Sequence, residues 1–139
     1  MAHIDAYLRF NGNCREAMTF YKECLGGELT MQTVAESPLA DQIPAEMAQN
    51  ILHATLIKDR LTLLGSDMVG PEGLIQGNTI SLSLNCGSEQ EIHEFFASLS
   101  SDGQVTHPLE SAFWGATFGD LIDKYGISWL LSYDKNVRD

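Results

Sequence analysis

The side chains best suited to acid–base chemistry are one histidine and one aspartate in the first half of the sequence. His53 stands with Thr55 in residues 51–57, and an imidazole that titrates near neutral pH can act as a general base. Asp67 follows residues 61–66, where its carboxylate can accept backbone N–H bonds in a turn or work beside His53. His53 and Asp67 are therefore the candidate catalytic residues, and a structural hydrogen-bonding role is open for each.

The segments that would position these residues begin with a strand and a helix. Residues 4–10 alternate between apolar and other side chains, which predicts a strand with one face on a core. Residues 13–25 carry apolar side chains at helical spacing, and Asn13 precedes Glu16 as in a capping box. Gly26 and the glycine after it would end this helix.

The second half of the chain repeats this pattern. Residues 79–84 alternate like residues 4–10, and Ser88 precedes Glu91 as the start of a second amphipathic helix. Strand-like runs follow each helix, at 28–34, 51–57 and 61–66 in the first half and at 104–108, 114–121 and 127–133 in the second. Each half therefore predicts a βαβββ module, and a ferredoxin-like domain is the alternative that leaves strands unassigned.

The predicted organisation is a single domain made of these two modules. Module one covers residues 1–68, a glycine-rich connector covers 69–77, and module two covers 78–135. A second irregular stretch, residues 35–49, can include a short helix around 45–49. A connection of that length is typical of a lid or a partner contact, with a plain solvated loop as the alternative.

Three strings in this chain resemble a known family. They are YLRFNGNCREAMTFYKECLGGEL, ILHATLIKDRLTLLGSD and FWGATFGDLIDKYGISWLL. Together with the paired modules, they resemble the vicinal oxygen chelate superfamily, which includes glyoxalase I, bleomycin-resistance proteins and extradiol dioxygenases, and within it the PhnB-like branch. The resemblance implies an α+β fold of two tandem βαβββ modules and a homodimer that forms cup-shaped sites.

The resemblance also implies where a divalent metal would be bound. In glyoxalase I the ligands occupy positions that correspond here to Asp5, a residue near Leu64, Thr79 and Leu130. Two of these side chains are aliphatic and Thr79 is a poor ligand, so the set falls short of the three protein ligands typical of a catalytic centre. We predict no metal ligands and no cofactor, with a non-standard site drawn from Asp5, His53 and Asp67 as the alternative.

The presumed cup face keeps a polar surface that suits a small ligand. Arg9 has donors for a carboxylate or phosphate, although a structural salt bridge with Asp5 is equally open. In the string that begins at Phe113, we interpret the residues chiefly as a strand–turn–strand packing motif, with Trp114 as the residue to line a pocket. The candidate ligand-binding residues are Asp5, Tyr7, Arg9, Thr62, Ser66, Thr79, Ser81, Trp114, Ser128 and Leu130.

Composition narrows the classes of function. The 139 residues carry a formal net charge of -11 without a cluster of Lys or Arg, which disfavours nucleic acid as a partner. No apolar run approaches a membrane span of about 20 residues. The first residues lack the pattern of a signal peptide, which predicts a cytoplasmic protein. No nucleotide-type cofactor motif supports methyl transfer.

The sequence thus predicts a small-molecule binder that acts without the usual metal centre. The first alternative is an enzyme of the lyase, isomerase or dioxygenase type, which uses non-standard metal ligands or His53 as an acid or base without metal. The second is a regulatory interaction domain whose cup is filled by its own side chains. Purified protein that carries near-stoichiometric metal would favour the enzyme.

Overall fold

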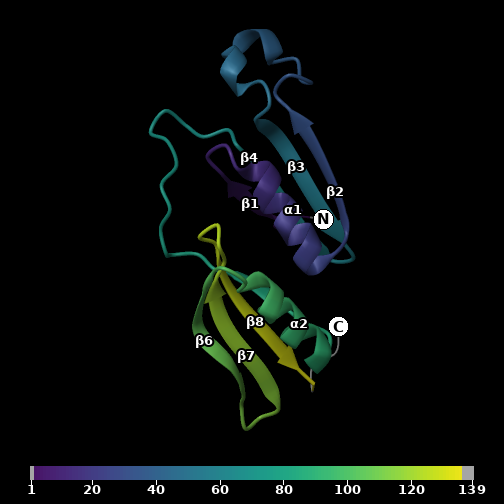
Figure 1. The fold of residues 1–139 in the computed structure, drawn as a ribbon. Helices are drawn as coiled ribbons and strands as arrows, with labels where there is room; N and C mark the ends of the chain where they lie inside the picture. Colours follow the sequence, from purple (N-terminus) through teal and green to yellow (C-terminus); the bar gives the residue numbers. More distant parts are fainter. Residues whose placement is uncertain (1, 136–139) are drawn as a thin grey trace. The chain divides into compact units, whose positions relative to one another are not determined.

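The computed structural model describes residues 2–135, which divide into two compact units, with the boundary in the sequence between Ile75 and Gln76 (Figure 1). The first unit contains β1 (Ala6–Arg9), α1 (Cys14–Leu25), β2 (Glu28–Thr33), β3 (Ile51–Lys58) and β4 (Leu61–Ser66). The second contains β5 (Leu82–Asn85), α2 (Glu89–Leu99), β6 (Gln104–Ser111), β7 (Ala116–Ile122) and β8 (Ser128–Asp134). Both units confirm the predicted βαβββ order.

Each unit has one four-stranded sheet with the same topology. The first sheet has the order β1-β4-β3-β2 and the second the order β5-β8-β7-β6. The first strand pairs parallel with the last in both sheets, and the other pairs are antiparallel. Matching the two registers makes Tyr7 equivalent to Ser83, Leu64 to Leu130, and His53 to Phe118.

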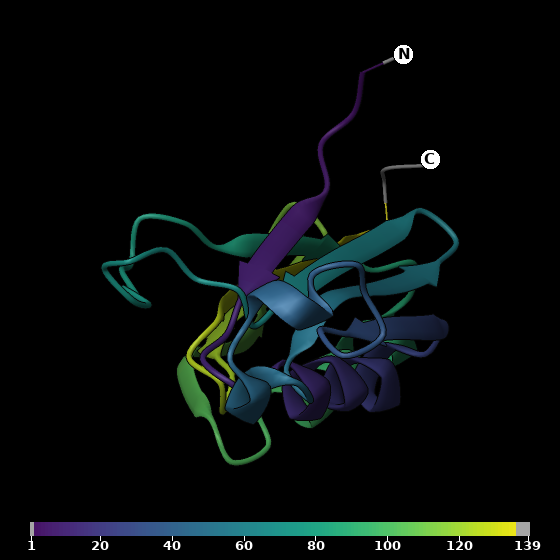
Figure 2. The same cartoon turned by 90° about the horizontal axis from the view of Figure 1, so that it is seen from above.

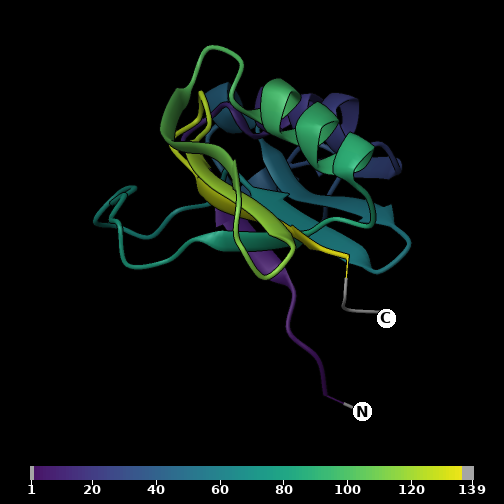
Figure 3. The ribbon, with the colours of Figure 1, turned by 90° about the horizontal axis from the view of Figure 1, so that it is seen from below.

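One helix covers one face of each sheet. Figure 2 shows α1 on one side of its sheet, and Figure 3 shows α2 on one side of the other sheet. The buried positions of α1, such as Ala17, Phe20 and Tyr21, recur at helical spacing because only one stripe of the helix meets the strands. Gly65 lets Met18 approach β4, and Gly119 lets Phe96 approach β7. Among the described residues of its own unit, the opposite face of each sheet carries no helix, and it is called the open face below.

The two helices begin in different ways. Ser88 caps α2 as predicted, because its Oγ accepts a hydrogen bond from the Glu91 N–H at 3.0 Å. The predicted cap at Asn13 is wrong, since its side chain makes no capping hydrogen bond. The N–H groups of Gly12 and Cys14 instead donate to Asp67, which the chain brings to this helix end from the end of β4.

The irregular segments contain little regular structure. Residues 67–81 form neither helix nor strand, and this stretch includes the predicted connector. The segment between β2 and β3 contains two 3-10 turns, Ala40–Gln42 and Ala45–Met47, the second at the place of the expected short helix. Within residues 2–135, no helix is long and apolar enough to cross a membrane.

Candidate functional site

The open face of the first sheet holds a cluster of four side chains, which we call the Arg9 cluster. Tyr7 and Arg9 extend from β1, and His53 and Thr55 from β3. Their positions alternate with Leu8 and Ala54, which are buried on the side of α1. The register places Tyr7 beside Leu64 and Leu64 beside Thr55, so the cluster crosses three strands of one face.

Contacts within the Arg9 cluster join a cation, two rings and a hydroxyl. The guanidinium of Arg9 lies 5.3 Å from the centre of the Tyr7 ring, within cation–π distance. The rings of Tyr7 and His53 are 6.2 Å apart with a tilt of 38°. The His53 Nε2 and the Thr55 Oγ1 are 3.2 Å apart, and the direction of this hydrogen bond depends on the imidazole tautomer. The cluster therefore offers hydrogen-bonding groups on an exposed surface.

Arg9 keeps its donors available for an external acceptor. Within the described part of the chain, no carboxylate lies within ion-pair distance of its guanidinium. Asp5, the expected salt-bridge partner, instead has its Oδ2 3.3 Å from the Nε2 of His3. Asp5 also precedes β1, which begins at Ala6.

Asp67 follows β4 and accepts hydrogen bonds from backbone N–H groups. Its Oδ1 accepts hydrogen bonds from the N–H groups of Gly12 and Cys14, each at 2.9 Å. Its Oδ2 accepts one from the N–H of Ile51 at 2.8 Å. The residue is 4% exposed, and both oxygens point to backbone donors. The carboxylate thus ties the start of α1 to the start of β3.

The two remaining candidates of the first unit, Ser66 and Thr62, differ in how accessible they are to a ligand. Ser66 is buried, and its Oγ donates to the Leu52 carbonyl at 2.8 Å and accepts from the Met68 N–H at 2.9 Å. Thr62 is half-buried on the open face and pairs with Ile57, which is 50% exposed. The hydroxyl of Ser66 is therefore already used, whereas the area around Thr62 and Ile57 is open.

The open face of the second sheet carries stacked rings, and we call His107, Phe118 and Trp114 the aromatic row. Phe118 on β7 stacks with His107 on β6 at 5.4 Å between ring centres and a 20° interplanar angle. Trp114 also stacks with Phe118, with 6.5 Å between the ring centres and a 4° interplanar angle. Phe113 meets Trp114 edge to face at 5.1 Å. Neither His107 nor Phe118 is among the candidate residues predicted from the sequence, although the alternation with buried Gly119 places Phe118 on the open face.

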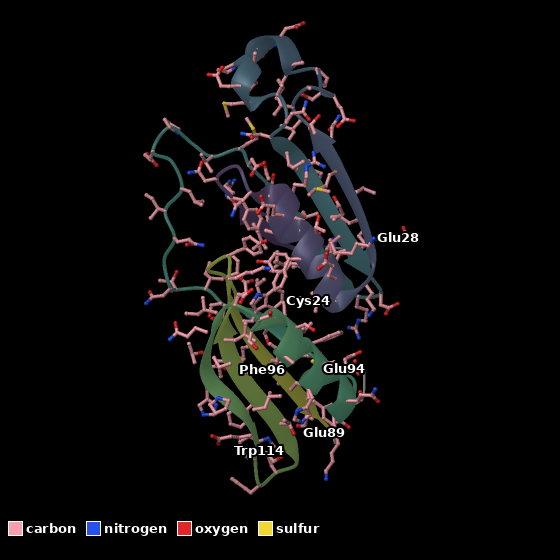
Figure 4. All side chains as sticks on the ribbon, viewed as in Figure 1. Cys24, Glu28, Glu89, Glu94, Phe96 and Trp114 are labelled. Atoms are coloured by element: carbon pink, nitrogen blue, oxygen red, sulfur yellow. The ribbon has the colours of Figure 1, made fainter. Side chains whose placement is uncertain are left out.

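Trp114 lies in a turn rather than in a strand. The predicted strand 114–121 begins two residues later, at Ala116. Gly115 closes the turn with a φ of 97°, a value that favours glycine, and its N–H donates to the Ala112 carbonyl. Figure 4 labels Trp114 near the β6–β7 turn and Phe96 on α2. The turn exposes 54% of Trp114 and 98% of Phe113.

Other second-unit candidates lie near the edge strand. Thr79 and Ser81 precede β5, which begins at Leu82 rather than at the predicted residue 79. The hydroxyls of Ser81 and Ser128 are 2.8 Å apart. The register continues from Tyr7 and Ser83 back to Asp5 and Ser81, so Ser81 and not Thr79 is the equivalent of Asp5.

The residues at the implied metal positions do not fit a divalent ion. Leu64 and Leu130 are equivalent positions of the two sheets, and neither side chain has a donor atom. Thr79 lies outside the strands, and Asp5 is paired with His3. Among residues 2–135, no three His, Cys, Asp or Glu side chains are grouped to hold a metal.

Two cysteines are buried away from either open face. Burial raises the pKa of the Cys14 thiol to about 12, and the nearby Asp67 carboxylate adds to this effect. Burial, with a contribution from Glu91, likewise raises the pKa of Cys86 to about 12. Thiols with such pKa values are poor nucleophiles near neutral pH, so these two are structural.

Two sheets of this topology, each covered by one helix, define the fold of the glyoxalase and bleomycin-resistance proteins. A glyoxalase-related enzyme from Fulvimarina pelagi has this fold, with a TM-score of 0.60 at 14% identity, over 96% of this chain and 89% of that one. The described residues thus confirm the predicted fold class.

The chain belongs to the family described as 3-demethylubiquinone-9 3-methyltransferase, the PhnB-like branch of the vicinal oxygen chelate superfamily, which matches residues 2–132. It is similar to protein PA1353 from Pseudomonas aeruginosa, with 37% identity and a TM-score of 0.82 over 96% of this chain and 98% of that one. It is also similar to a PhnB protein from Bacillus cereus described as a 3-demethylubiquinone-9 3-methyltransferase, with 28% identity and a TM-score of 0.75 over 95% and 99% of the two chains.

Proposed function

We propose that this protein binds a small organic molecule on the open face of its first sheet, without the usual metal centre of the superfamily. The observation that carries the proposal is the Arg9 cluster, in which a guanidinium, a phenol and an imidazole share one exposed surface. Arg9 presents donors in a fork that matches a carboxylate or phosphate. A ligand with one acidic group is therefore the expected class.

The apolar neighbours of this cluster support an organic ligand rather than a simple anion. Tyr7 is 45% exposed and Ile57 is 50% exposed, so the open face presents apolar area next to the charge. Burying such area on binding contributes roughly 25 cal/mol per Å² before the costs of association. Leu64 lies between Tyr7 and Thr55 in the register and offers further apolar surface.

The experiment is a thermal-shift screen of small aryl and alkyl carboxylates and phosphonates, run with and without a chelator. We expect at least one compound to raise the melting temperature and the chelator to leave this shift unchanged. Arg9→Met should abolish the shift, and Arg15→Met, which removes an exposed charge from α1, should keep it. A shift that needs added metal, or that survives Arg9→Met, contradicts the proposal.

Metal and product analysis test the alternative that the protein is an enzyme. His53 is exposed and could exchange a proton with a bound compound, with Thr55 orienting its ring. Near-stoichiometric zinc, nickel, manganese or iron in purified protein, lost in His53→Ala, would favour a metal-dependent reaction. Product formation from a bound compound without metal, lost in the same variant, would favour acid–base chemistry by His53.

The methyl transfer in the family's description is not part of this proposal. Each described unit is a mixed four-stranded sheet with one helix, whereas a methyl donor with a nucleoside group needs a ribose-binding motif that the sequence lacks. Calorimetric titration with S-adenosylmethionine should show no binding. The homodimer implied by the resemblance also stays a proposal, and light scattering coupled to size-exclusion chromatography tests it directly.

A further inference from the structure

The aromatic row of the second unit has a geometry that the Arg9 cluster does not share. The planes of Trp114 and Phe118 are 4° apart, although the two residues come from a turn and a strand. Aromatic pairs prefer offset-stacked or edge-to-face arrangements. Phe113 contacts Trp114 edge to face, at 88°. The stacked Trp114–Phe118 pair therefore presents ring faces of one orientation, on which a further flat ring can stack.

The pair also leaves aromatic surface open to a ligand. The ring centres are 6.5 Å apart, within the range of offset-stacked aromatic pairs, so the two rings present faces of the same orientation. Trp114 is 54% exposed, so a large part of its surface is open to a ligand. His107 stacks with Phe118 and extends the row, with 5.4 Å between the ring centres. A flat ligand can thus stack without displacing the core on the side of α2.

Charge around the row selects among flat ligands. Glu110 pairs with Phe118 and Asp120 pairs with His107 in the register of β6 and β7. Residues 82–123, which include β5, α2, β6 and β7, contain no Lys or Arg, and at the end of β8 Asp134 pairs with Ala116 and is followed by Lys135. Carboxylates thus predominate around the row. Aromatic faces attract cations through their quadrupole, and nearby carboxylates add to this attraction. An anionic ring would meet the opposite field.

We infer that Trp114 and Phe118 bind a planar aromatic compound that is neutral or cationic, stacked parallel to their planes. This inference uses second-unit residues alone and stands whether or not the Arg9 cluster binds a ligand. Binding at this site would not need a metal, because the affinity would come from aromatic stacking and from the nearby carboxylates.

Three probes of similar size test the inference on the full chain by calorimetry and tryptophan emission. They are 9-aminoacridine, which is flat and cationic, anthracene-9-carboxylate, which is flat and anionic, and 1-adamantylamine, which is cationic but not flat. We expect saturable binding of 9-aminoacridine that quenches tryptophan emission. Anthracene-9-carboxylate should bind at least about tenfold more weakly, and 1-adamantylamine should not bind measurably.

Matched variants locate the binding. Trp114→Leu and Phe118→Leu should each weaken 9-aminoacridine binding by about tenfold or more, the range expected for loss of one stacking partner. Phe113→Leu should change the affinity less than about twofold, because this neighbouring ring is perpendicular to the pair. Circular dichroism spectra of all three variants verify that they are folded.

Several results would overturn the inference. Equal binding of 9-aminoacridine and 1-adamantylamine would show that charge alone attracts the probe. An equal loss in Phe113→Leu would show nonspecific adsorption to the exposed turn. Unchanged affinity in the folded Trp114→Leu and Phe118→Leu variants would place the probe elsewhere, and the absence of saturable binding would remove the site altogether.

Discussion

Replacement of Asp67 by alanine gives the sharpest test of how the first unit is held together. The change removes three acceptor interactions from the N–H groups of Gly12, Cys14 and Ile51. The bonds to Cys14 and Ile51 are buried, and the bond to Gly12 is partly buried. Hydrogen bonds to a charged group contribute about 1.5–3 kcal/mol each, and a buried donor left unpaired costs about 1–3 kcal/mol.

The three interactions share one carboxylate, so their energies do not simply add. We expect Asp67→Ala to lower the free energy of unfolding by about 3–5 kcal/mol, a large part of the typical 5–15 kcal/mol. Asp67→Asn keeps one acceptor oxygen, so the N–H groups on the other side face an amide NH₂. Its loss should be about 1–3 kcal/mol. Asp41→Ala is the control, since Asp41 is exposed in a 3-10 turn, and it should lose less than about 0.5 kcal/mol.

Urea denaturation followed by far-UV circular dichroism measures these differences. If the free energy of unfolding falls by about 2 kcal/mol per M urea, the midpoint of the alanine variant should lie at a urea concentration about 2 M lower than that of the parent protein. A loss below about 1 kcal/mol for Asp67→Ala would refute the structural role. Parent-like stability of Asp67→Asn together with a lost ligand shift would return Asp67 to the candidate catalytic residues.

Three further predictions concern packing, capping and titration. Gly119→Ala should destabilise the protein by about 1–3 kcal/mol, because an added Cβ would lie 2.8 Å from Phe96, whereas Gly77→Ala meets nothing within 4 Å and should be neutral in thermal unfolding. Ser88→Ala should lower stability by about 0.5–2 kcal/mol in urea titrations, through loss of the cap of α2. The Cys14 thiol has its pKa raised from 9.0 to about 12 by burial, so the folded state holds this proton more tightly than the unfolded chain. The corresponding stability is complete below pH 9.0 and is lost as the pH rises toward 12; urea midpoints should therefore fall at alkaline pH, and Cys14→Ala should flatten the decline. A midpoint that rises with pH in this range would contradict the direction of the shift.

The order of elements could be predicted from the sequence because it depends on local periodicity. Alternation in residues 4–10 and 79–84 and the helical stripes that follow arise from burial of one face, which the chain encodes residue by residue. The first and last residues of the strands were harder to predict from the sequence. Strand β5 begins at Leu82 because Ser81 and Thr79 precede the hydrogen-bonded ladder, and no local signal separates them from the strand.

The cap of α1 could not be predicted from the neighbouring residues alone. Asn13 has the residue type and spacing of a cap, but the N–H groups at this helix end donate to Asp67, far along the chain. The buried carboxylate satisfies three donors at once, which one asparagine side chain cannot do. The aromatic row was missed for the same reason, since only the pairing of β6 with β7 brings His107 beside Phe118.

A carboxylate links the start of each helix to a strand of its own unit. In the first unit Asp67 joins the start of α1 to β3, and in the second Glu89 of α2 accepts a hydrogen bond from Thr117 on β7. The donors differ, since they are backbone N–H groups in the first unit and a threonine hydroxyl in the second.

The open faces, by contrast, differ at equivalent positions. Tyr7 and His53 of the first unit correspond to Ser83 and Phe118 of the second, whereas Leu64 and Leu130 are the same residue type. The side of each sheet that packs on its helix is constrained by the core, whereas the open face tolerates changes of residue type more readily. A polar face that carries Arg9 and an aromatic face with acidic neighbours in one duplicated chain therefore favour the two different binding chemistries proposed above, and Leu64 and Leu130 leave the implied metal positions without donor atoms.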